Sequence, residues 1–242
     1  MSVALITGGS RGLGLATARA LVERDWQLVI DGRDATALEA AAQELGGMVR
    51  AIPGDVADPA HRRALVAAVA QLGRLDLLVN NASLLGPSPQ PELEHYPLDV
   101  LRHVYEVNIL APLALVQLAL PWLRAGNGRV VNITSDAAVE AYAGWGGYGS
   151  SKAALEQLTN ILMQEMAEPG PRVYLADPGD LRTQMHQEAF PGEDISDRPL
   201  PEVAVPGLVA LAEGDLPNGR YRLQDYPAWA TPYPAAAAGT VA

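Results

Sequence analysis

A tyrosine and a lysine stand four residues apart in the segment YGSSK, at Tyr148 and Lys152. That spacing places both side chains on one face of a helix. An ammonium group one turn from a phenol favours the phenolate, so a phenol in this setting can exchange a proton with a substrate oxygen. Pairs at this spacing also arise by chance on helix surfaces. The pair therefore needs support from the rest of the chain.

The elements that would position this pair follow from the hydrophobic pattern. Expected strands cover residues 3–7, 27–31, 49–53, 75–80, 129–134 and 172–176, and expected helices cover 12–25, 35–45, 59–73, 98–123 and 148–167. Short apolar strands separated by amphipathic helices indicate parallel βαβ units. We therefore expect an α/β fold: a doubly wound parallel sheet between two helix layers, a three-layer αβα Rossmann fold in a single domain over residues 1–226.

The pattern loosens after residue 183. Residues 184–200 are polar and interrupted by proline and glycine, which indicates a loop or a lid over a substrate. Residues 202–213 are expected to form a last helix and 219–226 a last strand. An irregular C-terminal tail is expected over 227–242.

Composition excludes several classes of protein. The 242 residues are 49% hydrophobic, which is enough for one sizeable core. Cysteine is absent and the four histidines lack metal-ligand spacing, so we expect no disulfide, thiol nucleophile or metal site. The net charge of −11 argues against a nucleic-acid partner. The N-terminal segment has the features of neither a signal peptide nor a membrane span, so we expect a cytoplasmic protein with no membrane partner.

A glycine-rich segment, TGGSRGLG (residues 7–14), lies between the first expected strand and the first expected helix. Glycines at such a junction permit a tight turn and the close approach of a pyrophosphate, which the N–H groups of the helix N-terminus can bind. The spacing differs from the G-x-G-x-x-G dinucleotide fingerprint. Alone, the segment is also compatible with an ordinary strand–helix turn.

The segment T-G-x-x-x-G-x-G at this position resembles the short-chain dehydrogenase/reductase family. Other motifs of that family follow in order: NNAS at 80–83, Asn108 in YEVNIL, Ser135 after the fifth strand, Tyr148 with Lys152, and DPGDLRT at 177–183. Each lies at the carboxyl end of an expected strand or on the expected helix. Open α/β sheets bind their ligands at that edge.

The resemblance implies an NADPH-dependent oxidoreductase that transfers a hydride between the nicotinamide and a small carbonyl or alcohol substrate. Tyr148 would act as acid in reduction and as base in oxidation. Lys152 would lower the pKa of Tyr148 and hydrogen-bond the nicotinamide ribose. Ser135 would donate to the substrate oxygen, and Asn108 would hold a water that links Lys152 to solvent.

Two arginines favour NADP(H) as the coenzyme. Arg33, after the second strand, suits a 2′-phosphate through its charge and forked donors. Arg11, inside the glycine loop, is the second basic residue that NADP-type members of the family carry. Asp31 is the basis of the alternative, because an acidic residue at this strand end chelates the ribose hydroxyls in NAD-preferring members. If Asp31 takes that role, the coenzyme is NAD(H).

Further cofactor contacts follow from the resemblance. Asp55 would take the adenine amino group, Val56 a backbone contact, and Thr183 the nicotinamide carboxamide, while Asn80 would help to hold the sheet edge. Asp55 could instead cap the third helix, although Asp58 is better placed for that role. The complete expected cofactor-binding set is Gly8, Ser10, Arg11, Gly12, Leu13, Gly14, Arg33, Asp55, Val56, Asn80, Ala82, Tyr148, Lys152, Pro178, Gly179 and Thr183.

Three positions depart from the family pattern. Ser83 replaces a usual glycine, and Asp136 and Asp177 stand where small or apolar residues are common. Tyr142 and Trp145 could line the substrate pocket or pack beneath it. The sequence leaves open whether these two, Asp136 or Asp180 contact substrate.

Alternative functions remain at this point. A non-catalytic NADP(H)-binding sensor would keep the nucleotide fold, but it would not need the tyrosine and lysine pair. A nucleotide-sugar dehydratase or epimerase usually has a larger C-terminal substrate region. The helices near 105–123 and 148–167 are apolar on more than one face, which predicts a homodimer or homotetramer unless both are enclosed in one core.

Overall fold

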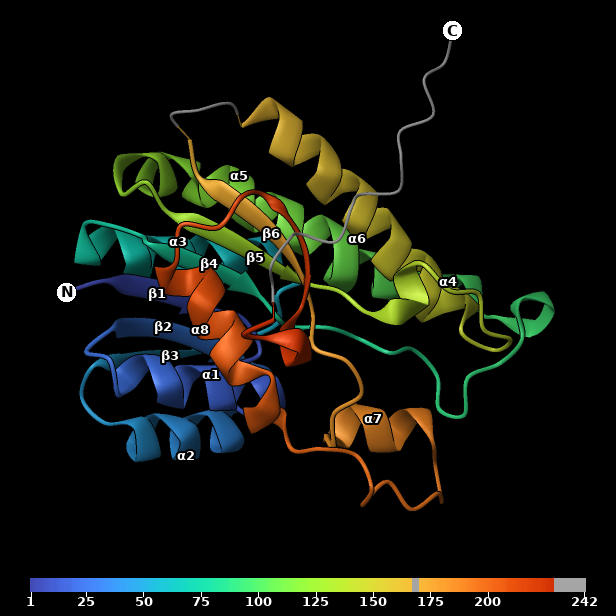
Figure 1. Ribbon diagram of the computed structural model, residues 1–242. Helices are drawn as coiled ribbons and strands as arrows, with labels where there is room; N and C mark the ends of the chain where they lie inside the picture. Colours follow the sequence, from blue (N-terminus) through green and yellow to red (C-terminus); the bar gives the residue numbers. More distant parts are fainter. Residues whose placement is uncertain (167–169, 229–242) are drawn as a thin grey trace, which may run out of the picture.

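The computed structural model describes residues 1–166 and 170–228, and these form a parallel sheet between helices (Figure 1). The strands of the sheet follow the order β3-β2-β1-β4-β5-β6-β7, and every neighbouring pair is parallel. Their bounds are β1 Val3–Ile6, β2 Gln27–Gly32, β3 Val49–Pro53, β4 Leu77–Asn80, β5 Arg129–Ile133, β6 Arg172–Asp177 and β7 Gly219–Arg222. The expected doubly wound α/β fold is confirmed.

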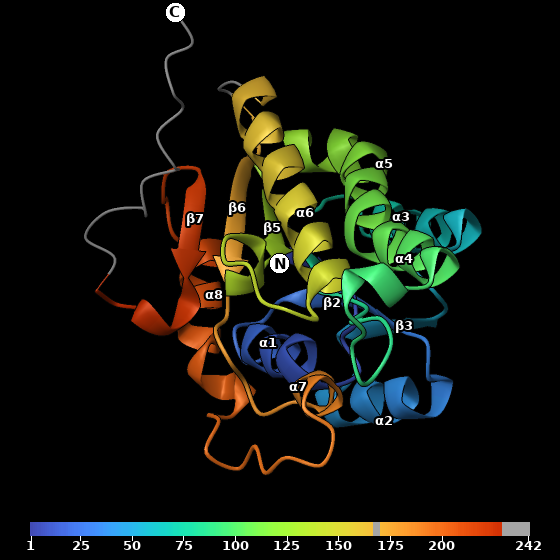
Figure 2. The same cartoon turned by 90° about the vertical axis from the view of Figure 1, so that its right-hand side faces the viewer.

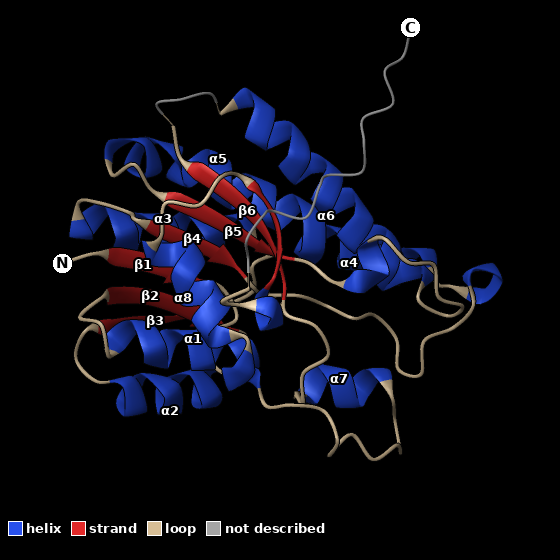
Figure 3. Cartoon of the chain, in the orientation of Figure 1, coloured by secondary structure: helices blue, strands red, loops and turns tan. Residues whose placement is uncertain are grey.

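The helices connect these strands (Figure 3). Their bounds are α1 Gly12–Val22, α2 Ala35–Leu45, α3 Pro59–Leu72, α4 Leu98–Tyr105, α5 Ala111–Ala125, α6 Gly146–Glu165, α7 Gln184–Ala189 and α8 Val205–Glu213. A π-helical turn, η2 (Glu106–Leu110), joins α4 to α5. Short 3-10 turns are η1 Leu93–His95, η3 Asp136–Ala138, η4 Pro201–Val203 and η5 Leu223–Asp225.

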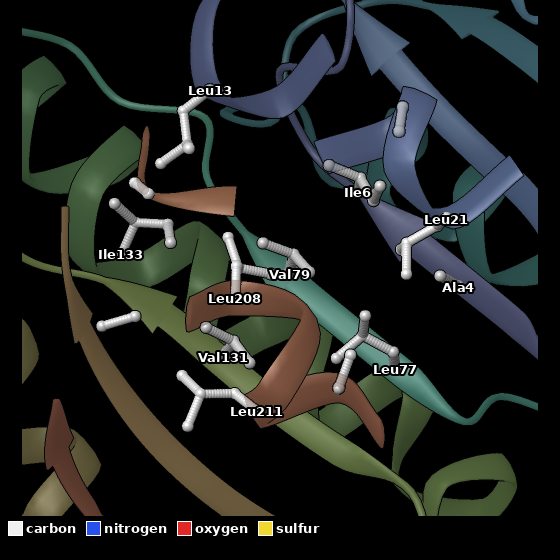
Figure 4. Packing of buried hydrophobic residues seen from close by; sticks show 14 of the residues in the cluster. Ala4, Ile6, Leu13, Leu21, Leu77, Val79, Val131, Ile133, Leu208 and Leu211 are labelled. Carbon is white, nitrogen blue, oxygen red and sulfur yellow. The ribbon is translucent and has the colours of Figure 1, made fainter. Parts of the chain in front are cut away.

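The two faces of the sheet carry separate hydrophobic clusters, since successive strand residues point to opposite sides. Ala4 and Ile6 of β1 pack with α1, α2 and α8 (Figure 4). Val3 and Leu5 pack with α3 and α5 on the other face. Figure 2 shows these helix layers on opposite sides of the sheet. Burial on both faces explains why the strands are continuous apolar runs rather than alternating ones.

Helix boundaries follow from local sequence signals. Asp58 accepts a hydrogen bond from Ala60 N at 2.8 Å, and Pro59 occupies the first position of α3. Asp34 caps α2 in the same way by accepting from the backbone N–H groups of Thr36 and Ala37. Aspartate as the cap and proline as the first helical residue are both favoured choices.

The structure differs from the sequence prediction in three segments. The expected helix over 98–123 is interrupted by the π turn, which carries Asn108. The segment expected to be irregular at 184–200 begins with α7. The last strand ends at Arg222, where a 3-10 turn follows, instead of extending to residue 226. Residue 167 and most of the expected tail, 229–242, lie outside the described residues.

Residues Leu98–Ala125 are long and apolar enough to cross a membrane by length and composition alone, with a mean hydropathy of 1.5. Half of that stretch is buried inside the protein. Leu115, Val116 and Leu123 of α5 belong to the cluster between the sheet and α3. The apolar character of α5 is therefore accounted for by its place in a helix layer.

Candidate active site

A cleft of about 1320 Å³ runs along the carboxyl ends of the strands. Loops after β1 to β6 contribute to its wall, and Figure 3 shows these loops leaving the sheet at one edge. The sheet order reverses direction between β1 and β4, because β2 and β3 lie on one side of β1 and the later strands on the other. Such a switch point is where doubly wound sheets bind ligands.

The glycine loop forms one end of the cleft. Gly8 and Gly12 have φ angles of +66° and +56°, which glycine adopts readily and other residues rarely do. A Cβ on Gly14 would collide with the carbonyl oxygen of Gly8, so the loop folds tightly onto the first turn of α1. Unlike α2 and α3, α1 has no side-chain cap at its N-cap residue, Arg11. Its first N–H groups are thus available to an anion such as a pyrophosphate.

Asp31 holds this loop from within the protein. Its side chain is buried, with Oδ1 accepting a hydrogen bond from Gly8 N at 2.7 Å and Oδ2 2.9 Å from His61 Nε2. Gly54 leaves room for the imidazole, since a Cβ there would collide with the ring. Each oxygen of the carboxylate therefore already has a protein partner. The sequence contained no periodic or motif signal for the contact with His61.

Two arginines stand where the cleft opens beside β2. Arg33 is exposed and has no side-chain partner among the described residues. Arg11 is half exposed, forms an ion pair with Asp34 at 3.4 Å and donates to Gln184 of α7. Guanidinium groups bind phosphate through charge and forked donors. This end of the cleft can therefore hold a phosphate beyond the pyrophosphate.

Asp55 and Val56 line the cleft after β3. Asp55 Oδ1 accepts from Ala57 N at 2.8 Å, which closes a turn rather than capping α3. The helix cap is Asp58, as its sequence position indicated. The carboxylate of Asp55 lies at the cleft wall. Its predicted contact with the adenine of the cofactor stays a prediction.

Asn80 is not among the residues that line the cleft, but it helps to hold the sheet edge, as predicted. Its Nδ2 donates to Asn132 Oδ1 at 2.7 Å, and Asn132 donates to Thr159 of α6, so Asn80 links β4, β5 and α6 inside the protein. The next residue, Asn81, lines the cleft and donates to the carbonyl oxygens of Thr7 and Gly8. Because β4 ends at residue 80, the first side chain beyond the strand faces the cleft. Ala82 lines it as expected.

Ser135, Tyr148 and Lys152 meet at the floor of the cleft. Ser135 lies just after β5, while Tyr148 and Lys152 lie one turn apart near the start of α6. The hydroxyls of Ser135 and Ser83 lie near that of Tyr148, close enough to affect its pKa. Lys152 Nζ donates to Ile133 O at 2.9 Å and lies 5.5 Å from the centre of the Tyr148 ring.

The electrostatics of the ligand-free site differ from the sequence prediction. Burial raises the pKa of Tyr148 well above its usual value, and the carboxylates of Asp177 and Asp136 add to that increase. The polar hydroxyls of Ser135 and Ser83 nearby act in the opposite direction. Burial also lowers the pKa of Lys152 to about 8. Lys152 is not among the groups that shift the pKa of Tyr148 in this structure, where its ammonium donates to Ile133 O, so the lowering by Lys152 stays a prediction.

Asn108 is buried behind the cleft and is not among its lining residues. Its Nδ2 donates to Leu84 O and Ser151 Oγ, both at 2.9 Å, and its Oδ1 accepts from Leu84 N at 2.8 Å. The side chain thus ties the loop after β4 to α6. A π turn of this kind is frequent at functional sites. The expected water relay through Asn108 stays a prediction.

Residues after β6 complete the cofactor side of the cleft. Pro178, Gly179 and Thr183 line it as expected. Gly179 has a φ of +66°, and its N–H donates to Asp177 Oδ1 at 2.9 Å. Thr183 caps α7 and faces the glycine loop, where a Cβ on Gly12 would meet its Cγ2 at 3.6 Å. The two loops therefore bound the cleft from opposite sides.

Aromatic rings form the other end of the cleft. Trp145 lies 5.9 Å from Tyr148, 6.4 Å from Tyr142 and 5.8 Å from Phe190 of the segment after α7. All four rings line the cleft, which answers the question left open for Tyr142 and Trp145. Asp136 and Asp180 line it as well. The contribution of Phe190 was not predicted, since its segment carried no motif.

The arrangement suits a nicotinamide dinucleotide. The cleft begins at the tight glycine loop and the uncapped N-terminus of α1. It continues past the two arginines and the strand-end loops to Ser135, Tyr148 and Lys152. In the part of the chain that the structure describes, no group of three or more His, Asp or Glu side chains could hold a metal ion. A proton-exchanging phenol beside a dinucleotide cleft is suited to hydride transfer with acid–base assistance.

Comparisons with known proteins agree with this geometry. Residues 2–194 match the family model described as short chain dehydrogenase. The L-fucose dehydrogenase of Mus musculus is 35% identical over 187 residues, which cover 77% of this chain and 67% of that protein. The serine 3-dehydrogenase of Agrobacterium fabrum is 38% identical over 182 residues, which cover 74% of this chain and 72% of that protein.

Solved structures show the same relationship over most of the chain. A short chain dehydrogenase of Shigella flexneri, in complex with NADP, is 27% identical and has a TM-score of 0.85. The similarity covers 92% of this chain and 97% of that chain. The chain therefore belongs to the short chain dehydrogenase family, whose members are oxidoreductases that bind a nicotinamide cofactor and act on small alcohol or carbonyl substrates.

Proposed function

We propose that this protein is an NADP(H)-dependent oxidoreductase that interconverts a carbonyl and an alcohol, with Ser135, Tyr148, Lys152 and Asn108 as its active-site residues. The observation that carries the proposal is the meeting of Ser135, Tyr148 and Lys152 at the floor of the cleft that begins at the glycine loop. A non-catalytic NADP(H) sensor is the alternative. It would have no use for a serine hydroxyl beside a tyrosine hydroxyl at the floor of the cleft.

The preference for NADP(H) over NAD(H) is supported by two side chains at the carboxyl end of β2, Asp31 and Arg33. The carboxylate of Asp31, which would chelate a ribose in the NAD alternative, is buried against Gly8 N and His61. Arg33 is exposed at the cleft, where a guanidinium suits a 2′-phosphate. The Shigella flexneri relative was solved with NADP. We infer that Arg33 and Arg11 hold the 2′-phosphate and that the uncapped N-terminus of α1 holds the pyrophosphate.

The protein's own residues handle the proton. When bound, the cofactor supplies or accepts the hydride. Because the pKa of Tyr148 is raised, its phenol is protonated at neutral pH and can donate a proton to a substrate oxygen. Ser135 hydrogen-bonds the same oxygen and orients it. Lys152, with a pKa of about 8, is mostly charged at neutral pH and favours the phenolate that remains.

The relatives suggest the size of the substrate. L-fucose dehydrogenase and serine 3-dehydrogenase are named for small hydroxylated compounds. The cleft beyond Tyr148 is walled by Tyr142, Trp145 and Phe190 and has room for a small molecule next to the dinucleotide. We propose a small carbonyl or alcohol substrate at this end.

We also propose that the protein forms a homodimer or homotetramer through α5 and α6. Leu118 of α5 and Ile161 of α6 are 37% and 44% exposed, and Leu110 at the end of the π turn is 50% exposed. Both helices belong to the same helix layer (Figure 2). Association would remove these side chains from water.

The test is the oxidation of NADPH, followed by absorbance, against a panel of aldehydes, ketones, diketones, quinones and ketoesters, with NADH as the comparison. Tyr148→Phe should lower kcat by at least about 100-fold with NADPH binding retained. Tyr105→Phe is the matched control, because the Tyr105 hydroxyl contacts Ser150 Oγ outside the cleft. Undiminished turnover in Tyr148→Phe would refute the mechanism. Tight NADPH binding with no turnover of any substrate would favour the sensor.

A further inference from the structure

The carboxylate of Asp136 lies directly on the candidate catalytic serine. Ser135 Oγ donates to Asp136 Oδ1 at 2.7 Å, and Ala137 N donates to the same oxygen at 2.8 Å. Asp136 Oδ2 accepts from the Tyr142 hydroxyl at 3.1 Å. The side chain is exposed at the cleft wall, and among the described residues no lysine, arginine or histidine pairs with it.

This contact has a consequence for the serine. A hydroxyl has one proton to donate, and that of Ser135 is directed at Asp136. To hydrogen-bond a substrate oxygen as well, Ser135 must release the carboxylate. Release is favourable when another donor replaces Ser135 at Asp136, since an unsatisfied carboxylate under a bound substrate is unfavourable. A substrate bound in the cleft can contact both Ser135 and Asp136, so the substrate itself can supply the replacing donor.

A positive charge fits this position better than a neutral donor. Tyr142 is shared between two carboxylates, with its hydroxyl 3.1 Å from Asp136 Oδ2 and 2.8 Å from Glu140 Oε2. One phenol proton cannot satisfy both, so negative charge accumulates beside Ser135. The Tyr142 and Trp145 rings stand next to it, and aromatic faces attract cations. A hydroxyl would supply a hydrogen bond but would leave the charge uncompensated.

The position of the cation on the substrate follows from the same contacts. The reacting oxygen must lie against the hydroxyls of Tyr148 and Ser135, and the carboxylate is one hydrogen bond away from Ser135. A donor on the carbon next to the reacting carbon reaches Asp136 while the oxygen stays on Ser135. A donor on a carbon further from the reacting carbon would lie beyond the reach of the Asp136 carboxylate.

We propose that the substrate carries a protonated amine on the carbon adjacent to the reacting carbon, and that Asp136 binds this amine and thereby frees the Ser135 hydroxyl for the reacting oxygen. The substrate class is thus the vicinal amino alcohols and the corresponding amino ketones. The inference rests on the proposed oxidoreductase function and specifies the substrate of that same site.

The test compares three alcohols on one aryl skeleton with NADP⁺ at pH 8: 2-amino-1-phenylethanol, 1-phenylethane-1,2-diol and 1-phenylethanol. The phenyl ring suits the wall made by Trp145 and Phe190. The kcat/KM for the amino alcohol should exceed that for the diol by about 10- to 100-fold, as expected for a hydrogen bond between charged groups. Asp136→Asn should reduce this ratio to near one.

Asp99→Asn is the matched control, because Asp99 is an exposed carboxylate in the first turn of α4 outside the cleft, and it should keep the ratio. Asp136→Ser provides a second variant if the asparagine variant does not fold. Equal kcat/KM for the three alcohols would overturn the inference, as would an Asp136→Asn variant that loses activity equally on all three. Turnover of other carbonyls but of none of these amino compounds would also refute the inference. Failure to bind NADPH or to turn over anything would instead refute the proposed function on which it rests.

Discussion

Arg220 Nη2 lies 3.0 Å from Asp177 Oδ2, and this ion pair joins β7 to the carboxyl end of β6 beside the reacting groups. The same guanidinium donates to Glu156 Oε1 at 2.9 Å and to the backbone oxygen of Ser135 at 3.2 Å. Glu156 lies on α6, one turn beyond Lys152. Strand β7 therefore holds the backbone at Ser135, the end of β6 before Pro178 and helix α6, which carries Tyr148 and Lys152.

Removing the guanidinium of Arg220 should lower the free energy of unfolding. Arg220→Met leaves the carboxylates of Asp177 and Glu156 buried without their shared cation, and breaking a buried pair in this way costs about 3–5 kcal/mol. Urea denaturation followed by circular dichroism measures the change. Arg19→Met is the control, because Arg19 pairs with Glu44 at the surface and such a pair contributes about 0–1 kcal/mol. Equal losses in the two variants would contradict the role given to Arg220.

The buried lysine should make stability depend on pH. The pKa of Lys152 is about 8 in the folded protein and 10.5 for an unperturbed lysine, so between these pH values the unfolded chain holds a proton that the folded protein does not. The free energy of unfolding therefore rises with pH across this window. Relative to Lys152→Met, the ligand-free wild type should gain roughly 3 kcal/mol between pH 7 and pH 10.5. The measurement is urea denaturation of both proteins at a series of pH values.

The comparison between wild type and Lys152→Met removes the contribution of groups that titrate in both proteins. A difference in unfolding free energy that stays constant from pH 7 to pH 10.5 would mean that Lys152 keeps an ordinary pKa. A fall with increasing pH would mean that its carboxylate neighbour, Glu156, outweighs burial and raises the pKa. Either result would exclude a lowered pKa for this lysine.

Elements near the sheet could be predicted from the sequence because their signals are local. Strand β3 matches its predicted bounds, and α2 and α3 begin at their predicted positions with Asp34 and Asp58 as caps. Ser135, Tyr148 and Lys152 were predicted from motif spacing, and the fold brings their elements together at the cleft. The topology follows from the βαβ pattern, so the place of these residues at the strand ends follows as well.

The contacts that could not be predicted join segments far apart in the chain. Asp31 meets His61 and Asp177 meets Arg220, and neither pair has a periodic or motif signal. The end of β4 at Asn80 was predicted correctly, but no local signal showed that the Asn80 side chain bonds to Asn132 inside the protein and that Asn81 lines the cleft instead. The raised pKa of Tyr148 depends on burial and on two carboxylates from different elements, Asp177 at the end of β6 and Asp136 in η3.

Charge on the exposed face of α5 and α6 should change the oligomeric state. Ile161→Glu places a carboxylate where the proposed interface would bury an apolar side chain, and the desolvation of that charge opposes association. Analytical ultracentrifugation should show dimer or tetramer for the wild type and a shift to monomer for the variant. Val139→Glu is the control, because Val139 is 63% exposed but lies after β5 at the end of η3, outside α5 and α6. A wild type that sediments as a monomer would refute the proposed assembly.

The coenzyme preference should depend on Arg33. Arg33→Ser removes an exposed guanidinium that would bind the 2′-phosphate, and loss of one such charged hydrogen bond weakens NADPH binding by about 10- to 100-fold. The affinity for NADH, which lacks this phosphate, should change little. Arg63→Ser, at an exposed position of α3 outside the cleft, controls for the loss of positive charge in general. Fluorescence titration of both cofactors measures the dissociation constants. If Arg33→Ser weakened NADH as much as NADPH, the guanidinium would contact a part common to both, and the 2′-phosphate would have to be held by Arg11 or left unbound.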